Sequence, residues 1–132
     1  MLPDVLYGMQ VMVAVDTGSG AGGDTTAWLV ADAGEVWVLE WALGFHADDH
    51  AARTTEWDLY DQITSVVCPV RALTAPIAAS VFNVCYGSDF PGKLVLTPNG
   101  VKLGFKTNTV TAAHNVSIRA LVTKYRSVPD KV

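Results

Sequence analysis

The chain has 132 residues, of which half are hydrophobic and only 17% are charged, whereas about 25% is usual in soluble domains. This length fits one domain with its own core. The net charge of −4 argues against a role in binding nucleic acid, and no apolar run approaches the roughly 18 residues of a membrane span. A chain so poor in charge is expected to cover part of its surface with partner proteins.

The first residues are interpreted as an arm. Residues 1–7 show no alternation, and a free tail would not need apolar side chains there. We therefore expect the arm to dock on a neighbouring subunit, which would remove these side chains from water. The candidate self-association residues are Leu2, Val5, Leu6 and Tyr7.

A strand at 9–15 follows, then a glycine-rich loop at 16–24. Residues 34–45 form the central element, because β-branched and aromatic residues dominate between two glycines. In a strand, alternate side chains share a face. The odd positions are therefore predicted to line the core: Trp37, Leu39, Trp41, Leu43 and Phe45.

The remaining strands are short and separated by turn signals. Pro69 and Pro76 frame a loop or an edge segment, since proline cannot donate into a ladder. Cys68 and Cys85 are expected to be unpaired and buried. Further strands are predicted at 25–31, 53–61, 63–68, 77–86, 93–96, 101–106 and 115–126. The expected buried residues are Trp37, Trp41, Trp57, Leu59, Val101, Leu103, Phe105, Ile118 and Val122.

This spacing of short strands predicts an all-β single domain, built as a two-sheet antiparallel sandwich that is jelly-roll-like. The sandwich proper is expected at 8–126, between the N-terminal arm at 1–7 and a polar tail at 127–132.

Three features could carry chemistry. A strand ending in Asp16, then a glycine-rich loop and a second strand, is similar to the opening of ribonuclease H-like nucleases, in which the first carboxylate holds a divalent metal. The helices that such a nuclease needs downstream are missing from the pattern. The loop at 17–24 has no lysine and leads into a strand, which favours a flexible hairpin loop over a phosphate loop.

The third feature is the run from His46 to His50, which contains Asp48 and Asp49. These side chains could ligate zinc or calcium, but they would need a ligand from elsewhere, and His114 is the only other histidine. A solvated connection between two strands is the favoured interpretation. The sequence therefore predicts no catalytic residue, no metal, no cofactor and no enzymatic activity.

The order of features from Thr25 to Arg126 resembles a class of tailed-bacteriophage virion proteins built on a β-sandwich. The matching segments are 31–37, 48–59, 98–105 and 115–122, which hold, in this order, an Ala-Gly turn, an arginine that opens a strand, a Pro-Asn-Gly turn and a closing strand. The chain departs from the class at residues 113–115, where members of the class commonly have Gly-Asp before the last strand.

This resemblance implies a capsid decoration, or cement, protein that binds the major capsid protein on the virion surface after assembly in the host cytoplasm. The low charge and the apolar arm predict a homo-oligomer, for which the resemblance implies a trimer in the first instance. No nucleic-acid or membrane partner is expected, given the net charge and the lack of a long apolar run. The alternative is a phage tail-fibre or adaptor domain that binds a host glycan or another tail protein, for which Trp28 or Tyr60 could serve. A metal-dependent ribonuclease H-like nuclease is the remote alternative.

Overall fold

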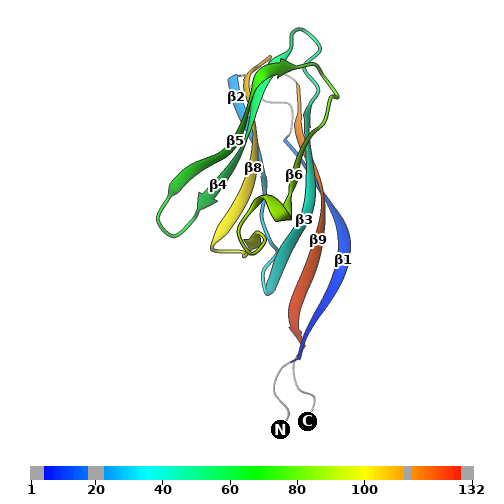
Figure 1. Cartoon of the computed structure of the whole chain (residues 1–132), viewed down its shortest axis with the longest axis vertical. Coiled ribbons are helices and arrows are strands. Elements are labelled where there is room, and N and C mark those ends of the chain that lie inside the picture. Colours follow the sequence, from blue (N-terminus) through cyan, green and yellow to red (C-terminus); the bar gives the residue numbers. More distant parts are fainter. Residues whose placement is uncertain (1–4, 18–22, 112–113, 129–132) are drawn as a thin grey trace.

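The computed structural model describes residues 5–17, 23–111 and 114–128 and shows two antiparallel sheets packed face to face (Figure 1). The first sheet contains β1 (Val5–Asp16), β3 (Glu35–His46), β6 (Asn83–Tyr86), β7 (Val95–Leu96) and β9 (Val116–Val128). The second contains β2 (Gly23–Leu29), β4 (Arg53–Asp61), β5 (Val66–Ile77) and β8 (Val101–Val110). A 3-10 turn, η1 (Gly87–Asp89), follows β6.

The strand order is β1-β9-β3-β6 in the first sheet, with β7 paired to β3, and β2-β8-β4-β5 in the second. Most connections carry the chain from one sheet to the other, which is the wiring of a jelly roll. The prediction of an all-β, two-sheet antiparallel sandwich is confirmed. No helix among the described residues is long and apolar enough to cross a membrane.

The core lies between the sheets and is centred on two aromatic rings. Trp57 of β4 and Phe105 of β8 are fully buried, with ring centroids 4.8 Å apart. Gly44 of β3 lies under the Phe105 ring, and a Cβ at this position would overlap that ring. Of the residues predicted to be buried, Leu59 and Val101 pack at the margin of the core. Those confirmed as buried are Trp37, Trp57, Leu103, Phe105, Ile118 and Val122.

The central strand contains a β-bulge that the sequence interpretation missed. Leu39 pairs with Val122, whereas Trp41 pairs with the adjacent Leu121, so Glu40 is an extra residue in the ladder. Before the bulge the odd positions face inward. After it the buried positions are Ala42, Gly44 and His46. The prediction that Trp41, Leu43 and Phe45 line the core was therefore wrong, because one inserted residue turns every later side chain to the other face.

The two ends of the sandwich also differ from expectation. Strand β1 begins at Val5, and its backbone pairs with β9 from Val5 opposite Val128 onward. The arm interpretation was thus wrong for residues 5–7, and the tail boundary at residue 127 falls inside β9. Leu2 lies outside the described residues.

Strand β5 runs through both Pro69 and Pro76 at the edge of its sheet, the place where missing amide donors are tolerated. The strand predicted at 77–86 is in fact the end of β5, a turn, and the short β6. Both cysteines are free, but only Cys85 is buried, while Cys68 is exposed.

Candidate functional site

The bulge at Glu40 places large apolar side chains on the outside of the first sheet. Trp41 and Leu43 lie opposite Tyr86 and Val84 of β6. These four side chains line a shallow groove of about 320 Å³. Tyr86 remains 50% exposed.

The apolar surface continues beyond this groove. Phe45 contacts Phe82 edge to face, with ring centroids 5.4 Å apart, and Phe82 is 57% exposed. In the other direction Trp41 pairs with Leu121, which pairs with the exposed Met12 of β1, so one apolar row crosses β6, β3, β9 and β1. We call this surface the outer apolar face, comprising Met12, Trp41, Leu43, Phe45, Phe82, Val84, Tyr86 and Leu121. Contiguous exposed apolar surface of this kind marks an interaction site in soluble proteins.

A second exposed apolar region lies at the turn between β4 and β5, which projects from the body of the sandwich (Figure 1). Ile63 is 81% exposed there, and Val66 and Val67 of the edge strand are about half exposed. We call these three residues the hairpin tip. Farther along β5, Arg71 donates a 3.2 Å hydrogen bond to the Val84 carbonyl and lies 3.7 Å from the Asp89 carboxylate. The hairpin is therefore anchored to the strand that borders the outer apolar face.

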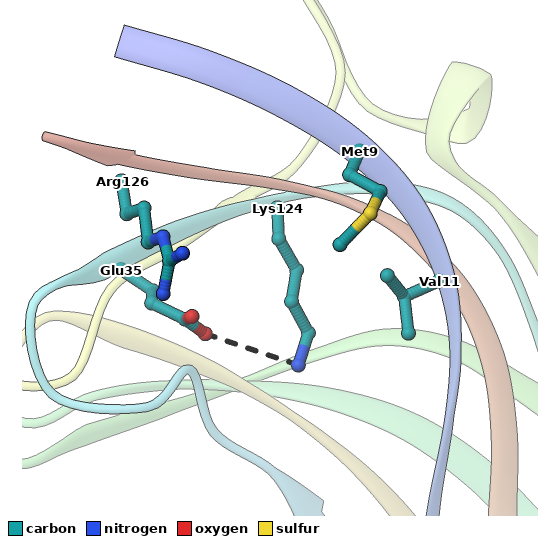
Figure 2. Close-up of a pocket in the computed structure, with 5 residues that line it drawn as sticks. All are labelled: Met9, Val11, Glu35, Lys124 and Arg126. Carbon is teal, nitrogen blue, oxygen red and sulfur yellow. Dashed lines mark ion pairs between the residues drawn. The ribbon is translucent and has the colours of Figure 1, made fainter. Parts of the chain in front are cut away.

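A pocket of about 210 Å³ lies on the inner side of the first sheet, near the end where β1 begins (Figure 2). Its Lys124 Nζ lies 3.8 Å from Glu35 Oε1 and 4.5 Å from the ring centroid of Trp37. The Trp37 indole in turn donates a 2.9 Å hydrogen bond to the same glutamate oxygen. These groups hold strands β3 and β9 together. The lining residues are Met9, Val11, Glu35, Lys124 and Arg126.

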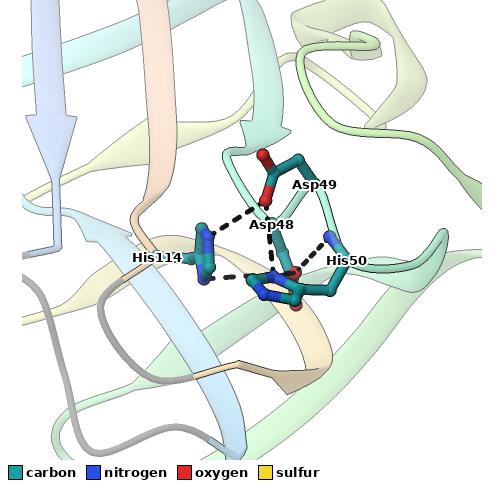
Figure 3. A group of neighbouring side chains, drawn as sticks. All are labelled: Asp48, Asp49, His50 and His114. Carbon is teal, nitrogen blue, oxygen red and sulfur yellow. Dashed lines mark hydrogen bonds and ion pairs between the residues drawn. The ribbon is translucent and has the colours of Figure 1, made fainter.

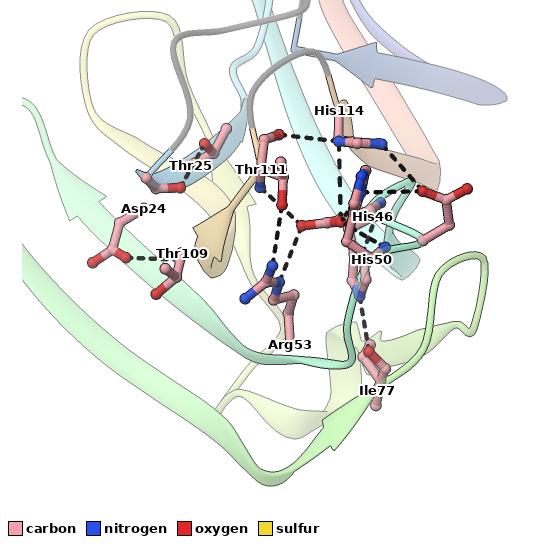
Figure 4. Close-up of polar contacts among 12 residues, drawn as sticks. Asp24, Thr25, His46, His50, Arg53, Ile77, Thr109, Thr111 and His114 are labelled. Atoms are coloured by element: carbon pink, nitrogen blue, oxygen red, sulfur yellow. Dashed lines mark hydrogen bonds and ion pairs between the residues drawn. The ribbon is translucent and has the colours of Figure 1, made fainter.

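At the opposite end of the sandwich the β3–β4 connection is organised by a buried carboxylate (Figure 4). Asp48 is fully buried, and its Oδ2 accepts hydrogen bonds from the Thr111 amide at 2.8 Å and from Arg53 Nε at 3.0 Å. Its Oδ1 accepts from the His50 amide at 3.0 Å. The hydrogen bond from Thr111 is the main reason that the pKa of Asp48 lies far below its usual value. The expected solvated connection was therefore wrong at this residue.

His46 is also fully buried beside this carboxylate. Its Nε2 lies 2.9 Å from the Ile77 carbonyl, and its Nδ1 lies 3.1 Å from the Asp48 amide. A carbonyl oxygen can only accept, so Nε2 carries the proton and Nδ1 accepts from the amide. This histidine is a structural bridge between β3, β5 and the connection.

Four potential metal ligands meet next to this network: Asp48, Asp49, His50 and His114 (Figure 3). His50 Nδ1 lies 3.3 Å from Asp48 Oδ1 and 3.3 Å from Asp49 Oδ1. His114 Nε2 lies 3.4 Å from Asp49 Oδ1. His114 comes from the β8–β9 connection and is the distant residue that the sequence left as the remaining candidate.

Asp16, on which the nuclease hypothesis rests, and Asp24, at the end of the same glycine-rich loop, are each engaged in other contacts. Asp16 forms a 3.0 Å ion pair with Arg119, and hydrogen bonds from Ser117 and Arg119 lower its pKa. Asp24 accepts a hydrogen bond from the Thr109 amide at 3.0 Å. Within the described part of the chain neither belongs to a group of three or more metal-ligating side chains.

The aromatic pair proposed for glycan binding lies on the outside of the second sheet. The Trp28 and Tyr60 ring centroids are 5.7 Å apart. Lys102 Nζ lies 4.7 Å from the Trp28 centroid and 4.9 Å from that of Tyr60. The ammonium group thus covers the rings that a sugar would have to stack on.

A buried acid lies on the same side of the second sheet. Asp58 is only 3% exposed, and its Oδ1 has no hydrogen-bond partner among the described residues. Burial, followed by the neighbouring Glu56 carboxyl, raises the pKa of Asp58 to about 7, while Lys106 opposes the shift. With a pKa of about 7, Asp58 holds its proton across the acid range, and the alternating pattern of residues 53–61 gives no sign of this.

The sequence matches no protein-family model and no curated protein. Among solved structures, the chain is similar to one in the cryo-EM structure of the giant freshwater prawn Macrobrachium rosenbergii extra small virus (XSV) VLP, with a TM-score of 0.55 and 14% identity over 94% of this chain and 81% of that one. A chain in the structure of infectious bursal disease virus Gx strain gives 15% identity over 95% of this chain and 37% of that one, but its TM-score of 0.35 carries no argument. At this level of identity the first comparison shows a shared fold, and it does not single out tailed bacteriophages.

Proposed function

We propose that this protein is a structural component of a virus particle and packs against other subunits through its outer apolar face. The observation that carries the proposal is the groove formed by Trp41, Leu43, Val84 and Tyr86 on the outside of the sandwich. In an isolated chain this groove would leave apolar side chains in water, and covering it gains about 25 cal/mol per Å². The similarity in fold to a chain of a virus-like particle supports the same conclusion.

Two apolar regions on different parts of the chain favour assembly into a closed ring. The hairpin tip and the outer apolar face belong to different sheets, although Arg71 links their borders. When one patch of a chain contacts a different patch of the next, the contact is heterologous, and repeated rotation can close it into a ring. A small ring, with a trimer as the first expectation, would satisfy both patches.

In its finer form the proposal is a capsid decoration, or cement, protein that sits on the capsid surface, binds the major capsid protein and is assembled in the host cytoplasm. The net charge of −4 supports a protein partner over nucleic acid. The self-association residues named from the sequence would add a further contact: Leu2, together with Val5, Leu6 and Tyr7, which belong to β1. A glycan-binding tail-fibre role is less well supported, because Lys102 covers the aromatic pair.

The proposal is tested by the mass of the purified chain in multi-angle light scattering, with negative-stain imaging of the same sample. We expect a small closed oligomer that Tyr86→Lys dissociates, since the substitution places a charge in the groove. Ala33→Lys is the matched control, because it adds the same charge at an exposed turn outside the face. A monomer at all concentrations would contradict the proposal, and large hollow shells would show a shell-forming subunit instead of a decoration protein.

The arm is tested separately. Deleting residues 1–4 leaves the β1–β9 ladder intact, because pairing begins at Val5. Weaker self-association of the shortened chain, with an unchanged circular dichroism spectrum, is expected if the arm contributes a contact.

A further inference from the structure

The cluster of Asp48, Asp49, His50 and His114 joins two chain segments at the end of the sandwich opposite to the start of β1 (Figure 3). The first three residues belong to the β3–β4 connection, and His114 belongs to the connection before β9. The backbone brings these connections together, because the Ala47 amide donates a 2.9 Å hydrogen bond to the Asn115 carbonyl. The ligand atoms all lie within 4.8 Å of one another.

The spacing of these atoms fits a tetrahedral ion. Zinc binds nitrogen and oxygen at about 2.0–2.2 Å, so neighbouring ligand atoms in a tetrahedral site lie about 3.3–3.6 Å apart. Three of the atom pairs already lie at 3.3, 3.3 and 3.4 Å. The remaining contact is longer: His114 approaches Asp48 Oδ1 to 4.0 Å, through Nδ1, so a bound ion would have to draw these two side chains together.

The side chains are also oriented as ligands. His114 Nδ1 lies 3.1 Å from the Thr111 carbonyl, which can only accept, so Nδ1 carries a proton and Nε2 presents its lone pair toward Asp49. A metal-bound histidine is usually fixed in this way, by a hydrogen bond from its other ring nitrogen. Arg53 and Thr111 likewise fix Asp48 Oδ2, while Oδ1 keeps capacity beyond its bond from the His50 amide.

The donor set discriminates among metals. Two imidazole nitrogens with two carboxylate oxygens suit zinc, whereas calcium takes six to eight oxygen ligands. Four protein ligands leave no open position, which is the arrangement of a structural zinc site. The Asp49 side chain is 79% exposed and that of His50 62% exposed, so an ion can reach the cluster from solvent.

We propose that Asp48, Asp49, His50 and His114 bind one zinc ion, which clamps the β3–β4 connection to the β8–β9 connection. The clamp is independent of the outer apolar face, and the sequence alone did not support it because its fourth ligand comes from a distant segment. It would stiffen the end of the sandwich at which both connections are otherwise held by hydrogen bonds.

The test uses the full chain without a histidine tag, stripped with a chelator and titrated with Zn²⁺ by calorimetry. We expect one ion per chain, a rise in Tm with Zn²⁺, and a tetrahedral visible spectrum with Co²⁺ as a substitute ion. His50→Gln and His114→Gln should each weaken zinc binding by at least about 100-fold, since loss of a mere supporting residue costs about 10–100-fold. Asp32→Asn, which removes an exposed carboxylate elsewhere, should leave the affinity unchanged.

Circular dichroism of each variant without metal shows whether it is folded, and His50→Gln is the safer variant because its side chain is mostly exposed. Zinc affinity that is the same in the parent chain and in a folded His50→Gln variant would overturn the proposal. Saturable binding of Ca²⁺ with no preference for Zn²⁺ would overturn it as well.

Discussion

Replacing the buried Asp58 by asparagine should stabilise the protein at neutral and higher pH but not at pH 4. Burial raises the pKa of this residue from 3.8 in the unfolded chain to about 7 in the fold. Between these values the folded chain holds a proton that the unfolded chain has released. Stability is therefore fully present below about pH 4 and is lost as the pH rises through 7. Asparagine keeps the shape of the protonated acid and cannot ionise.

The size of the effect follows from the shift. A difference of about three pKa units corresponds to about 4 kcal/mol at 1.36 kcal/mol per unit, and this is an upper limit. Solvent screening and the nearby Lys106 reduce the cost of the charged form, so we expect Asp58→Asn to gain about 2 kcal/mol at pH 8. At pH 4 the expected difference is close to zero, since both side chains are then neutral in the fold.

Urea unfolding followed by tryptophan fluorescence at a series of pH values gives the free energy of unfolding for both chains. Asp61→Asn is a control of opposite sign, because hydrogen bonds led by that from the Ile63 amide lower the pKa of Asp61. Its carboxylate stabilises the fold above pH 4, so its replacement should destabilise the protein at pH 8. A difference for Asp58→Asn that does not change with pH, or a loss of stability at pH 8, would refute the reasoning.

Four further substitutions test the fold. Trp37→Ala should lower the free energy of unfolding by about 3–5 kcal/mol, because it truncates a core side chain. Trp41→Ala, on the outer face after the bulge, should lower it by no more than about 2 kcal/mol in the same urea experiment. Equal losses for the two variants would contradict the bulge. Gly44→Ala should lower stability by about 1–3 kcal/mol, because the new Cβ overlaps the Phe105 ring, and an unchanged Tm would show that this packing is looser than described. His46→Leu should cost about 2–5 kcal/mol, because it leaves two buried backbone groups without partners, and a near-neutral result would show that water replaces the imidazole.

Alternation of apolar and polar residues located the regular strands because a buried face imposes a period of two. It succeeded for β4, where Trp57 is buried as predicted and the preceding Glu56 is only partly buried. It failed in the second half of β3, because the extra residue at Glu40 is defined by pairing with β9, about 80 residues away in the sequence. A bulge of this kind leaves the local pattern of apolar residues unchanged.

The candidate site was harder to predict for a similar reason. The histidines and aspartates of the β3–β4 connection have the composition of a solvated loop, and Asp48 is buried only because Arg53 and Thr111 supply donors. Likewise, His114 joins the cluster through the fold and not through sequence proximity. The apolar groove was missed because two of its residues, Trp41 and Leu43, were assigned to the core, whose side chains have the same chemistry as those of a protein interface.

The central claim is that the outer apolar face is covered in the assembled state. Hydrogen–deuterium exchange tests it directly, by comparing the assembled chain with the Tyr86→Lys variant under the same conditions. We predict that assembly slows exchange at the amides of β6 (Asn83–Tyr86) and of the turn between β4 and β5. Exchange at the amides of β2, an edge strand of the second sheet, should be unchanged. Equal exchange at β6 in the two samples, with protection confined to other strands, would contradict the claim.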